Sequence, residues 1–96
     1  MDKRVKDYIS QSEILAQLAE EAAELAQAAL KLRRAMDGAN PTPVSFADAY
    51  HNLIEEYSDV TLCFRELDMN YSPSVIEQKL KRWLKRLKGE PHEKVN

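Results

Sequence analysis

The chain has 96 residues, a formal net charge of −2 and 44% hydrophobic residues. This length fits one domain, and the composition is that of a soluble globular protein. The charge gives no reason to expect a nucleic-acid partner. With Cys63 as its single cysteine the chain forms no internal disulfide, so we expect a reducing, cytoplasmic setting. The first ten residues, MDKRVKDYIS, have no apolar run, so we expect no signal peptide, and no apolar run reaches the ~18 residues of a membrane span.

Helix-start and helix-stop signals predict a first long helix from about residue 10 to 36. Ser10 and Glu13 have the spacing of a capping box, and Gly38 suits the position just past a helix end. A proline-containing loop follows over residues 37–44. For the first nine residues the pattern allows a short helix or an irregular segment. The apolar stripe of this helix is Ile14, Leu18, Ala22, Leu25, Ala29, Leu32 and Met36.

Two further helices are predicted after the loop. Ser45 is an N-cap candidate for a helix that ends near residue 67. Ser72 and Pro73 suit the N-cap and first position of a third helix, which Gly89 ends. The stripe of the second helix is Phe46, Tyr50, Leu53, Tyr57, Val60, Phe64 and Leu67. The stripe of the third is Val75, Ile76, Leu80, Trp83, Leu84 and Leu87.

No segment alternates with the period of a strand, so we predict an all-α fold. The first two helices form an antiparallel hairpin, and the third helix is added to it. The single domain spans residues 1–96, with a core at about 10–88 and a flexible C-terminal tail at 89–96. Three stripes on a short chain, with Leu62 lying off the second stripe, predict that oligomerisation completes a four-helix-type bundle. We expect a homodimer or a dimer of dimers.

Two acidic clusters have no basic residue three or four positions away. They read EEAAE at residues 20–24 and EEYSD at residues 55–59. Like charges at helical spacing destabilise a helix by a few tenths of a kcal/mol per pair. Each cluster lies about 13 residues from the loop, which is ~20 Å along its helix. The hairpin therefore predicts that the two clusters face each other.

Four or more converging carboxylates require protons, basic partners or a cation. Oxygen ligands without His or Cys favour a hard ion, Mg²⁺ or Mn²⁺. The alternative is a pair of solvated acidic faces, which we favour for one cluster alone and not for the matched pair. His51 and His92 are not expected to be ligands, because the Glu-x-x-His pair of di-iron bundles is absent. Cys63 is expected to be a small packed residue.

The two clusters resemble the motifs of the MazG-like all-α nucleoside triphosphate pyrophosphatases. That pattern is Glu-Glu-x-x-Glu followed on a later helix by Glu-x-x-Asp, and the resemblance covers residues 12–88. It extends to the neighbouring stretches LAEEAAELAQA and NLIEEYSDV. The resemblance implies Mg²⁺-dependent cleavage of a (d)NTP to a monophosphate and pyrophosphate, by an oligomer with a dimeric core. By position, the implied metal ligands are Glu21, Glu24, Glu56 and Asp59.

Further side chains are candidates for catalysis and substrate binding. Glu20 or Glu55 could hold the attacking water or act as the base, although both also fit plain surface positions. Lys79 or Arg82 could reach the phosphates, and the similarity to the family favours Lys79; the alternative is a solvated basic face. The second function class is a non-catalytic oligomeric interaction module whose acidic face binds a basic partner. Dependence on Mg²⁺ separates the two classes.

Overall fold

A computed structural model describes residues 3–38 and 44–89 of this chain. In chain order its elements are the 3₁₀ helix η1 (Val5–Asp7) and the helices α1 (Gln11–Asp37), α2 (Phe46–Glu66) and α3 (Pro73–Leu87). These residues contain no strand, so the predicted all-α class is confirmed. Residues 39–43 of the predicted loop, and the predicted tail beyond Gly89 with His92, lie outside the described residues. None of the described helices has the length and apolar character of a membrane span.

Local capping places the helix ends where the sequence predicts them. The Glu13 N–H donates to Ser10 Oγ at 3.1 Å, and the Ser10 N–H donates to Glu13 Oε1 at 2.9 Å, which completes the capping box. Ser45 and Ser72 cap α2 and α3 through their side-chain oxygens. Gly38 ends α1 with φ at 68°, in the left-handed region that glycine enters at little cost.

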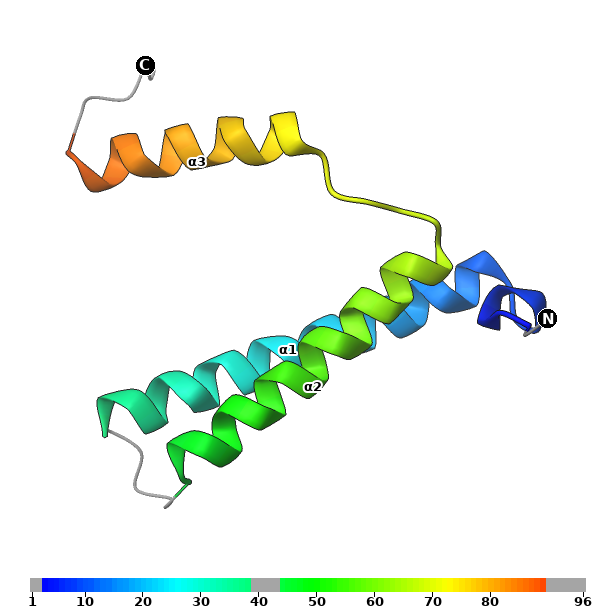
Figure 1. The fold of residues 1–96 in the computed structure, drawn as a ribbon, viewed down its shortest axis with the longest axis horizontal. Coiled ribbons are helices and arrows are strands. Elements are labelled where there is room, and N and C mark those ends of the chain that lie inside the picture. The colour runs from blue at the N-terminus through cyan, green and yellow to red at the C-terminus, as the bar shows by residue number, and fades with distance from the viewer. Residues whose placement is uncertain (1–2, 39–43, 90–96) are drawn as a thin grey trace.

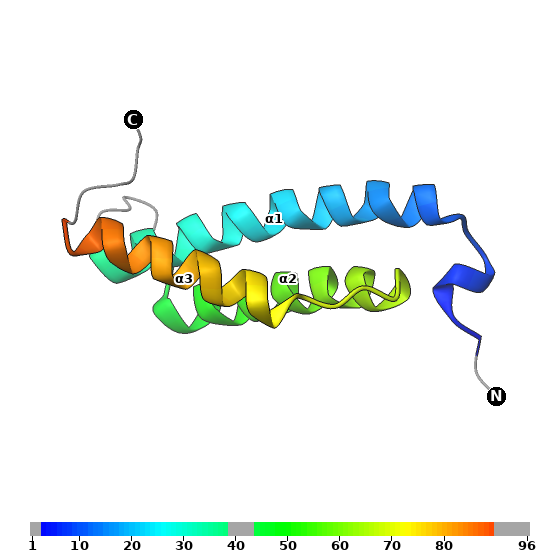
Figure 2. The same ribbon diagram turned by 90° about the horizontal axis from the view of Figure 1, so that it is seen from above.

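α1 and α2 pack side by side as the predicted antiparallel hairpin (Figures 1 and 2). Small side chains contribute half of the core, and small side chains let two helix axes approach closely. Few hydrophobic residues are buried for a chain of this length, so one copy leaves much apolar surface exposed. The buried hydrophobic residues are Ile14, Ala28, Ala49, Val60, Cys63 and Leu67.

The side of α2 that packs on α1 differs from the predicted stripe. Val60 and Leu67 of that stripe are buried and Leu53 is half-buried. The four aromatic residues of the stripe remain 39–61% exposed, because a single neighbouring helix cannot cover both flanks of α2. We call these four residues the aromatic face: Phe46, Tyr50, Tyr57 and Phe64.

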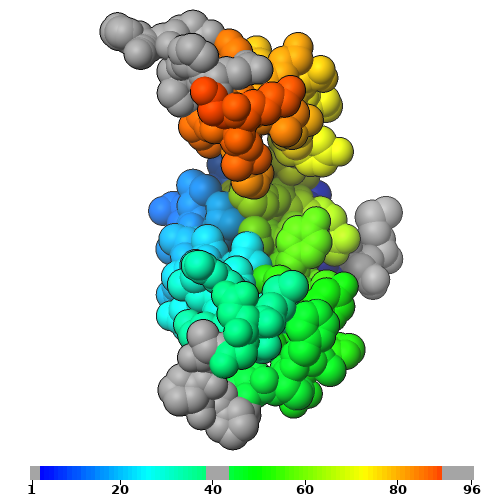
Figure 3. Space-filling view, turned by 90° about the vertical axis from the view of Figure 1, so that its left-hand side faces the viewer, coloured from blue at the N-terminus to red at the C-terminus, as the bar shows by residue number. Residues whose placement is uncertain are grey.

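α3 runs back above the hairpin without packing against it (Figure 1). Viewed along the long axis of the molecule, α3 is a layer of its own above α1 and α2 (Figure 3). All the large apolar residues of α3 are 42–71% exposed. The third predicted stripe is therefore not buried within one chain. We call it the α3 stripe: Val75, Ile76, Leu80, Trp83, Leu84 and Leu87.

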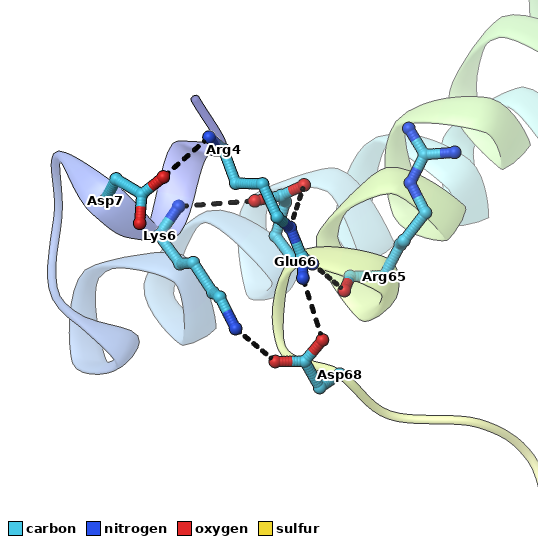
Figure 4. A network of polar contacts seen from close by, with 6 residues as sticks. All are labelled: Arg4, Lys6, Asp7, Arg65, Glu66 and Asp68. Carbon is cyan, nitrogen blue, oxygen red and sulfur yellow. Dashed lines mark hydrogen bonds and ion pairs between the residues drawn. The ribbon is translucent and has the colours of Figure 1, made fainter. Parts of the chain in front are cut away.

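A polar network at the C-terminal end of α2 ties the N-terminal segment to the α2–α3 connection (Figure 4). Arg4 pairs with Glu66 at 3.4 Å and with Asp68 at 3.0 Å, and it donates to the Arg65 carbonyl at 2.6 Å. Lys6 pairs with Asp68 at 2.7 Å, and its N–H donates to the buried Glu66 at 3.2 Å. Asp68 has φ at 57°, a backbone conformation that Asp and Asn tolerate better than most residues. The network therefore fixes the direction in which the chain leaves α2.

This network should make stability depend on the charge of Asp68. Hydrogen bonds from Lys6 and Arg4 lower the pKa of the Asp68 carboxyl. A lowered folded-state pKa means that the ionised group stabilises the fold above its unfolded pKa, and that this contribution is lost as pH falls through the folded value. We expect Asp68→Asn to lower the urea midpoint at neutral pH. The difference from wild type should close as the pH falls below the ordinary value of 3.8.

The midpoint is measured by circular dichroism at fixed protein concentration. Asn keeps the left-handed backbone accessible, so the comparison reports the charge and its hydrogen bonds. Glu77→Gln is the control, because Glu77 is 69% exposed in its pair with Lys81 and such pairs contribute little. Equal midpoints for Asp68→Asn and wild type at neutral pH would contradict the role of the network.

Candidate metal centre

Three carboxylates from α1 and α2 meet along the hairpin seam, and we call them the carboxylate cluster. Glu21 and Glu24 come from α1, and Glu56 comes from α2. One oxygen of each lies within 4.8 Å of the oxygens of the other two. Glu21 and Glu24 lie one helical turn apart, and antiparallel packing brings Glu56 to their level. The structure thus brings together three of the four metal ligands that the resemblance implies.

Two oxygens of the carboxylate cluster are buried without a hydrogen-bond partner. Glu21 Oε1 and Glu56 Oε1 are shielded from solvent, and neither bonds to a described residue. The other oxygen of Glu21 accepts from Gln17 Nε2 at 2.6 Å, so Gln17 holds this carboxylate in place. A buried carboxylate oxygen is costly unless a proton, a donor or a cation satisfies it. These two oxygens therefore leave room for a proton, a donor or a cation at the cluster.

The charges around Glu56 also disfavour its ionised form. Burial raises the pKa of Glu56 most, the charge of Glu24 and a hydrogen bond with Glu24 raise it further, and the charges of Asp59 and Glu21 add to the increase. Within residues 3–38 and 44–89, no ion pair joins a basic side chain to any member of the cluster. The ionised form of Glu56 is therefore disfavoured until a positive partner enters.

The donor set fits a hard divalent cation. The three ligand atoms are carboxylate oxygens, which Mg²⁺ and Mn²⁺ prefer to nitrogen or sulfur. Cys63 lies close enough for Glu21 and Asp59 to raise the pKa of its thiol, but burial is the larger cause of that increase. A protonated, buried thiol is a poor ligand for a soft metal. The prediction that Cys63 is a packed residue is confirmed by its 7% exposure.

Other predicted site residues on the hairpin lie around the cluster. Asp59 is exposed and one turn beyond Glu56 on the predicted ligand side of α2; its charge acts on Glu56, but its carboxylate is outside the group that meets. Glu20 and Glu55 are exposed and also outside that group. Their roles as metal ligand, base or water holder stay predictions.

The predicted phosphate-binding residues lie on α3. Lys79 and Arg82 line an open hollow of about 240 Å³ together with Trp83 and Arg86. All four side chains belong to one helix, and that helix stands apart from the hairpin in a single chain (Figure 1). The structure therefore does not bring Lys79 or Arg82 to the carboxylate cluster within one copy.

Gln17 and the residues of the polar network around Glu66 were not singled out from the sequence. Gln17 could have been found, because it precedes Glu21 by four positions and such pairs hydrogen-bond on a helix. Glu66 had no local signal. Its partners Arg4 and Lys6 lie 62 and 60 positions earlier in the chain, so only the tertiary fold reveals the pairing.

Comparison with known proteins identifies no relative of this chain. No protein-family model, curated protein or solved structure matches the chain. The similarity to MazG-like enzymes consequently rests on the two motifs and on their neighbouring residues.

Divalent cations should stabilise this protein. A cation that binds only the folded carboxylate cluster stabilises the fold by RT ln(1 + [L]/Kd), about 2.7 kcal/mol at a hundredfold excess over Kd. We expect millimolar Mg²⁺ or Mn²⁺ to raise the melting temperature more than NaCl at the same ionic strength. The melting temperature is followed by circular dichroism after treatment with a chelator.

Single substitutions show whether the response of the melting temperature to Mg²⁺ depends on the carboxylate cluster or on exposed acidic residues outside it. Because the pKa of Glu56 is raised in the fold, its ionised form destabilises the metal-free protein at neutral pH. Glu56→Gln should therefore melt no lower than wild type without metal, and it should lose the response to Mg²⁺. The matched control Glu20→Gln, at an exposed position outside the cluster, should keep that response. A wild-type protein indifferent to millimolar divalent ions would rule out the metal centre.

Proposed function

We propose that this protein is a Mg²⁺-dependent nucleoside triphosphate pyrophosphohydrolase, which converts a (d)NTP and water to a (d)NMP and pyrophosphate. The observation that carries the proposal is the convergence of Glu21, Glu24 and Glu56 with two buried oxygens left without partners. The motifs that supply these residues resemble those of the MazG-like pyrophosphatases, and membership of that family is part of the proposal. The acidic interaction module explains the charges, but it does not explain why one oxygen of Glu21 and one of Glu56 are buried without a partner.

The chemistry of triphosphate cleavage matches such a site. When bound, Mg²⁺ would supply charge neutralisation at the phosphates and would lower the pKa of a coordinated water. Glu21, Glu24 and Glu56 would hold the ion, with Asp59 as the fourth predicted ligand. Gln17 donates to one oxygen of Glu21, which favours an orientation in which the other oxygen of this carboxylate faces the cluster.

Water attack at the α-phosphorus forms a new P–O bond and breaks the bond to the oxygen that bridges to the β-phosphate. Pyrophosphate leaves with that oxygen, and the proton of the water passes to a carboxylate. Glu20 and Glu55 are the exposed carboxylates beside the cluster that could accept it. The proposal does not depend on Lys79 or Arg82, which α3 holds apart from the cluster in one chain.

Activity should be found in a panel of NTPs and dNTPs with Mg²⁺, scored for pyrophosphate against orthophosphate. Glu24→Gln and Asp59→Asn should abolish turnover with an unchanged helical circular dichroism signal, because each removes a ligand charge and little volume. A rate loss under about tenfold, ~1.4 kcal/mol of barrier, would show that the substituted residue is not a metal ligand.

Glu77→Gln on α3 serves as the matched carboxylate control and should retain full activity. Release of orthophosphate with accumulation of the diphosphate would contradict cleavage between the α- and β-phosphates. Binding of a basic partner without any need for Mg²⁺, and with no turnover of any nucleotide, would favour the interaction module instead.

A further inference from the structure

Two apolar surfaces of this chain have no partner within it. The aromatic face of α2 is 39–61% exposed, and the rings of Phe46 and Tyr50 stack on it with centroids 6.1 Å apart. Aromatic side chains offer on the order of 200 Å² each, so this face alone exposes roughly 400 Å². The α3 stripe adds six large apolar side chains that are 42–71% exposed. Patches of this size on a soluble protein mark interaction sites.

The aromatic face is separate from the carboxylate cluster. At about 3.6 residues per turn, it lies on one flank of the α1 contact, and Glu55 and Asp59 lie on the other flank. The remaining positions on its flank are uncharged, at Leu53, Ile54 and Thr61. A partner on the aromatic face therefore leaves the acidic flank open to cations and nucleotides.

Net charge favours pairing of α3 with the hairpin of another copy over pairing of two hairpins or of two α3 helices. Residues 11–66 carry ten carboxylates and four basic side chains, whereas residues 73–87 carry five basic side chains and one carboxylate. Hairpins of two copies repel each other, while the basic α3 of one copy is attracted to the acidic hairpin of another. The α3 stripe is also flanked by cations that can stay solvated at the rim of an interface.

The connection before α3 keeps this helix off its own hairpin. Arg4 and Lys6 hold Asp68 in the left-handed conformation directly after α2. From there the chain runs extended to α3, which stands as a separate layer (Figures 1 and 3). The same polar network that orders the N-terminal segment thus leaves the α3 stripe available to another molecule.

We propose that the α3 stripe of one copy docks on the aromatic face of a second copy, and that the exchange is reciprocal about a two-fold axis. Such an isologous dimer covers both surfaces of each chain at once. The two surfaces together approach the ~800 Å² per partner of a stable interface. Trp83 is the central anchor, since large aromatic side chains dominate such interfaces. The inference stands independently of the proposed enzymatic activity.

Disulfide trapping in the full chain tests the pairing of elements. Both proteins carry Cys63→Ala, one adds Tyr57→Cys on the aromatic face, and the other adds Leu84→Cys on the α3 stripe. The two are mixed in equal amounts, allowed to exchange subunits and oxidised mildly. The expected main product is a disulfide-linked heterodimer of the two variants, identified by mass.

Leu62→Cys is the matched control for Tyr57→Cys. Leu62 lies on the same helix and is 41% exposed, but it is outside the aromatic face, so it should not crosslink to Leu84→Cys. Crosslinks only between two Leu84→Cys copies would show that α3 pairs with α3, and crosslinks only between two Tyr57→Cys copies would show hairpin pairing. A monomeric intramolecular disulfide, in a chain with both substitutions, would show that α3 folds back. Each of these three results overturns the proposal.

The wild-type chain offers a second measurement that needs no engineered cysteine. Its single tryptophan is Trp83, which is 59% exposed in one copy. Docking moves this ring into an apolar interface, so its emission should shift to shorter wavelength as the protein is concentrated, in step with dimer formation by sedimentation equilibrium. Emission that stays solvent-like in a fully dimeric sample would place Trp83 outside the interface and overturn the proposal.

Discussion

Close packing of α1 on α2 along a seam of small side chains is the constraint on which the rest of this structure depends. Ala28 and Ala49 are almost completely buried, and residues of this size let two helices approach closely. The same approach brings glutamates of the two helices within reach of each other. A wider seam, filled by aromatic rings, would hold these carboxylates apart and would leave no site between them.

The seam imposes a local electrostatic cost at the carboxylate cluster. Glu56 lies half-buried beside other carboxylates, and both Glu21 and Glu56 keep an oxygen without a partner. The stabilising features lie away from this point, in the capped helix ends and in the polar network around Asp68. The capped helix ends and the polar network can offset the destabilising repulsion in the middle of the hairpin. Functional sites are commonly found where charges destabilise a fold in this way.

The two flanks of the hairpin divide the surface by chemistry. One flank presents the carboxylates of Glu55 and Asp59 to solvent. The other presents the aromatic face, which has the character of an interface core and lacks charge. A short chain with so small a core would gain stability if another copy covered this second flank, since burial of apolar area is the largest favourable term available to it.

The sequence by itself determined the helices and the meeting of the acidic motifs. Caps such as Ser10 and Gly38 act within one turn, and equal distances from the loop bring Glu21 and Glu56 to one level. The tertiary structure alone decided that Val60, Cys63 and Leu67 are buried and that the aromatic face stays exposed, because the position of the neighbouring helix cannot be read from the pattern of α2 itself. It also decided the burial of Glu66 and the left-handed turn at Asp68. These depend on Arg4, which lies 62 and 64 positions before them in the chain, beyond the reach of any local pattern.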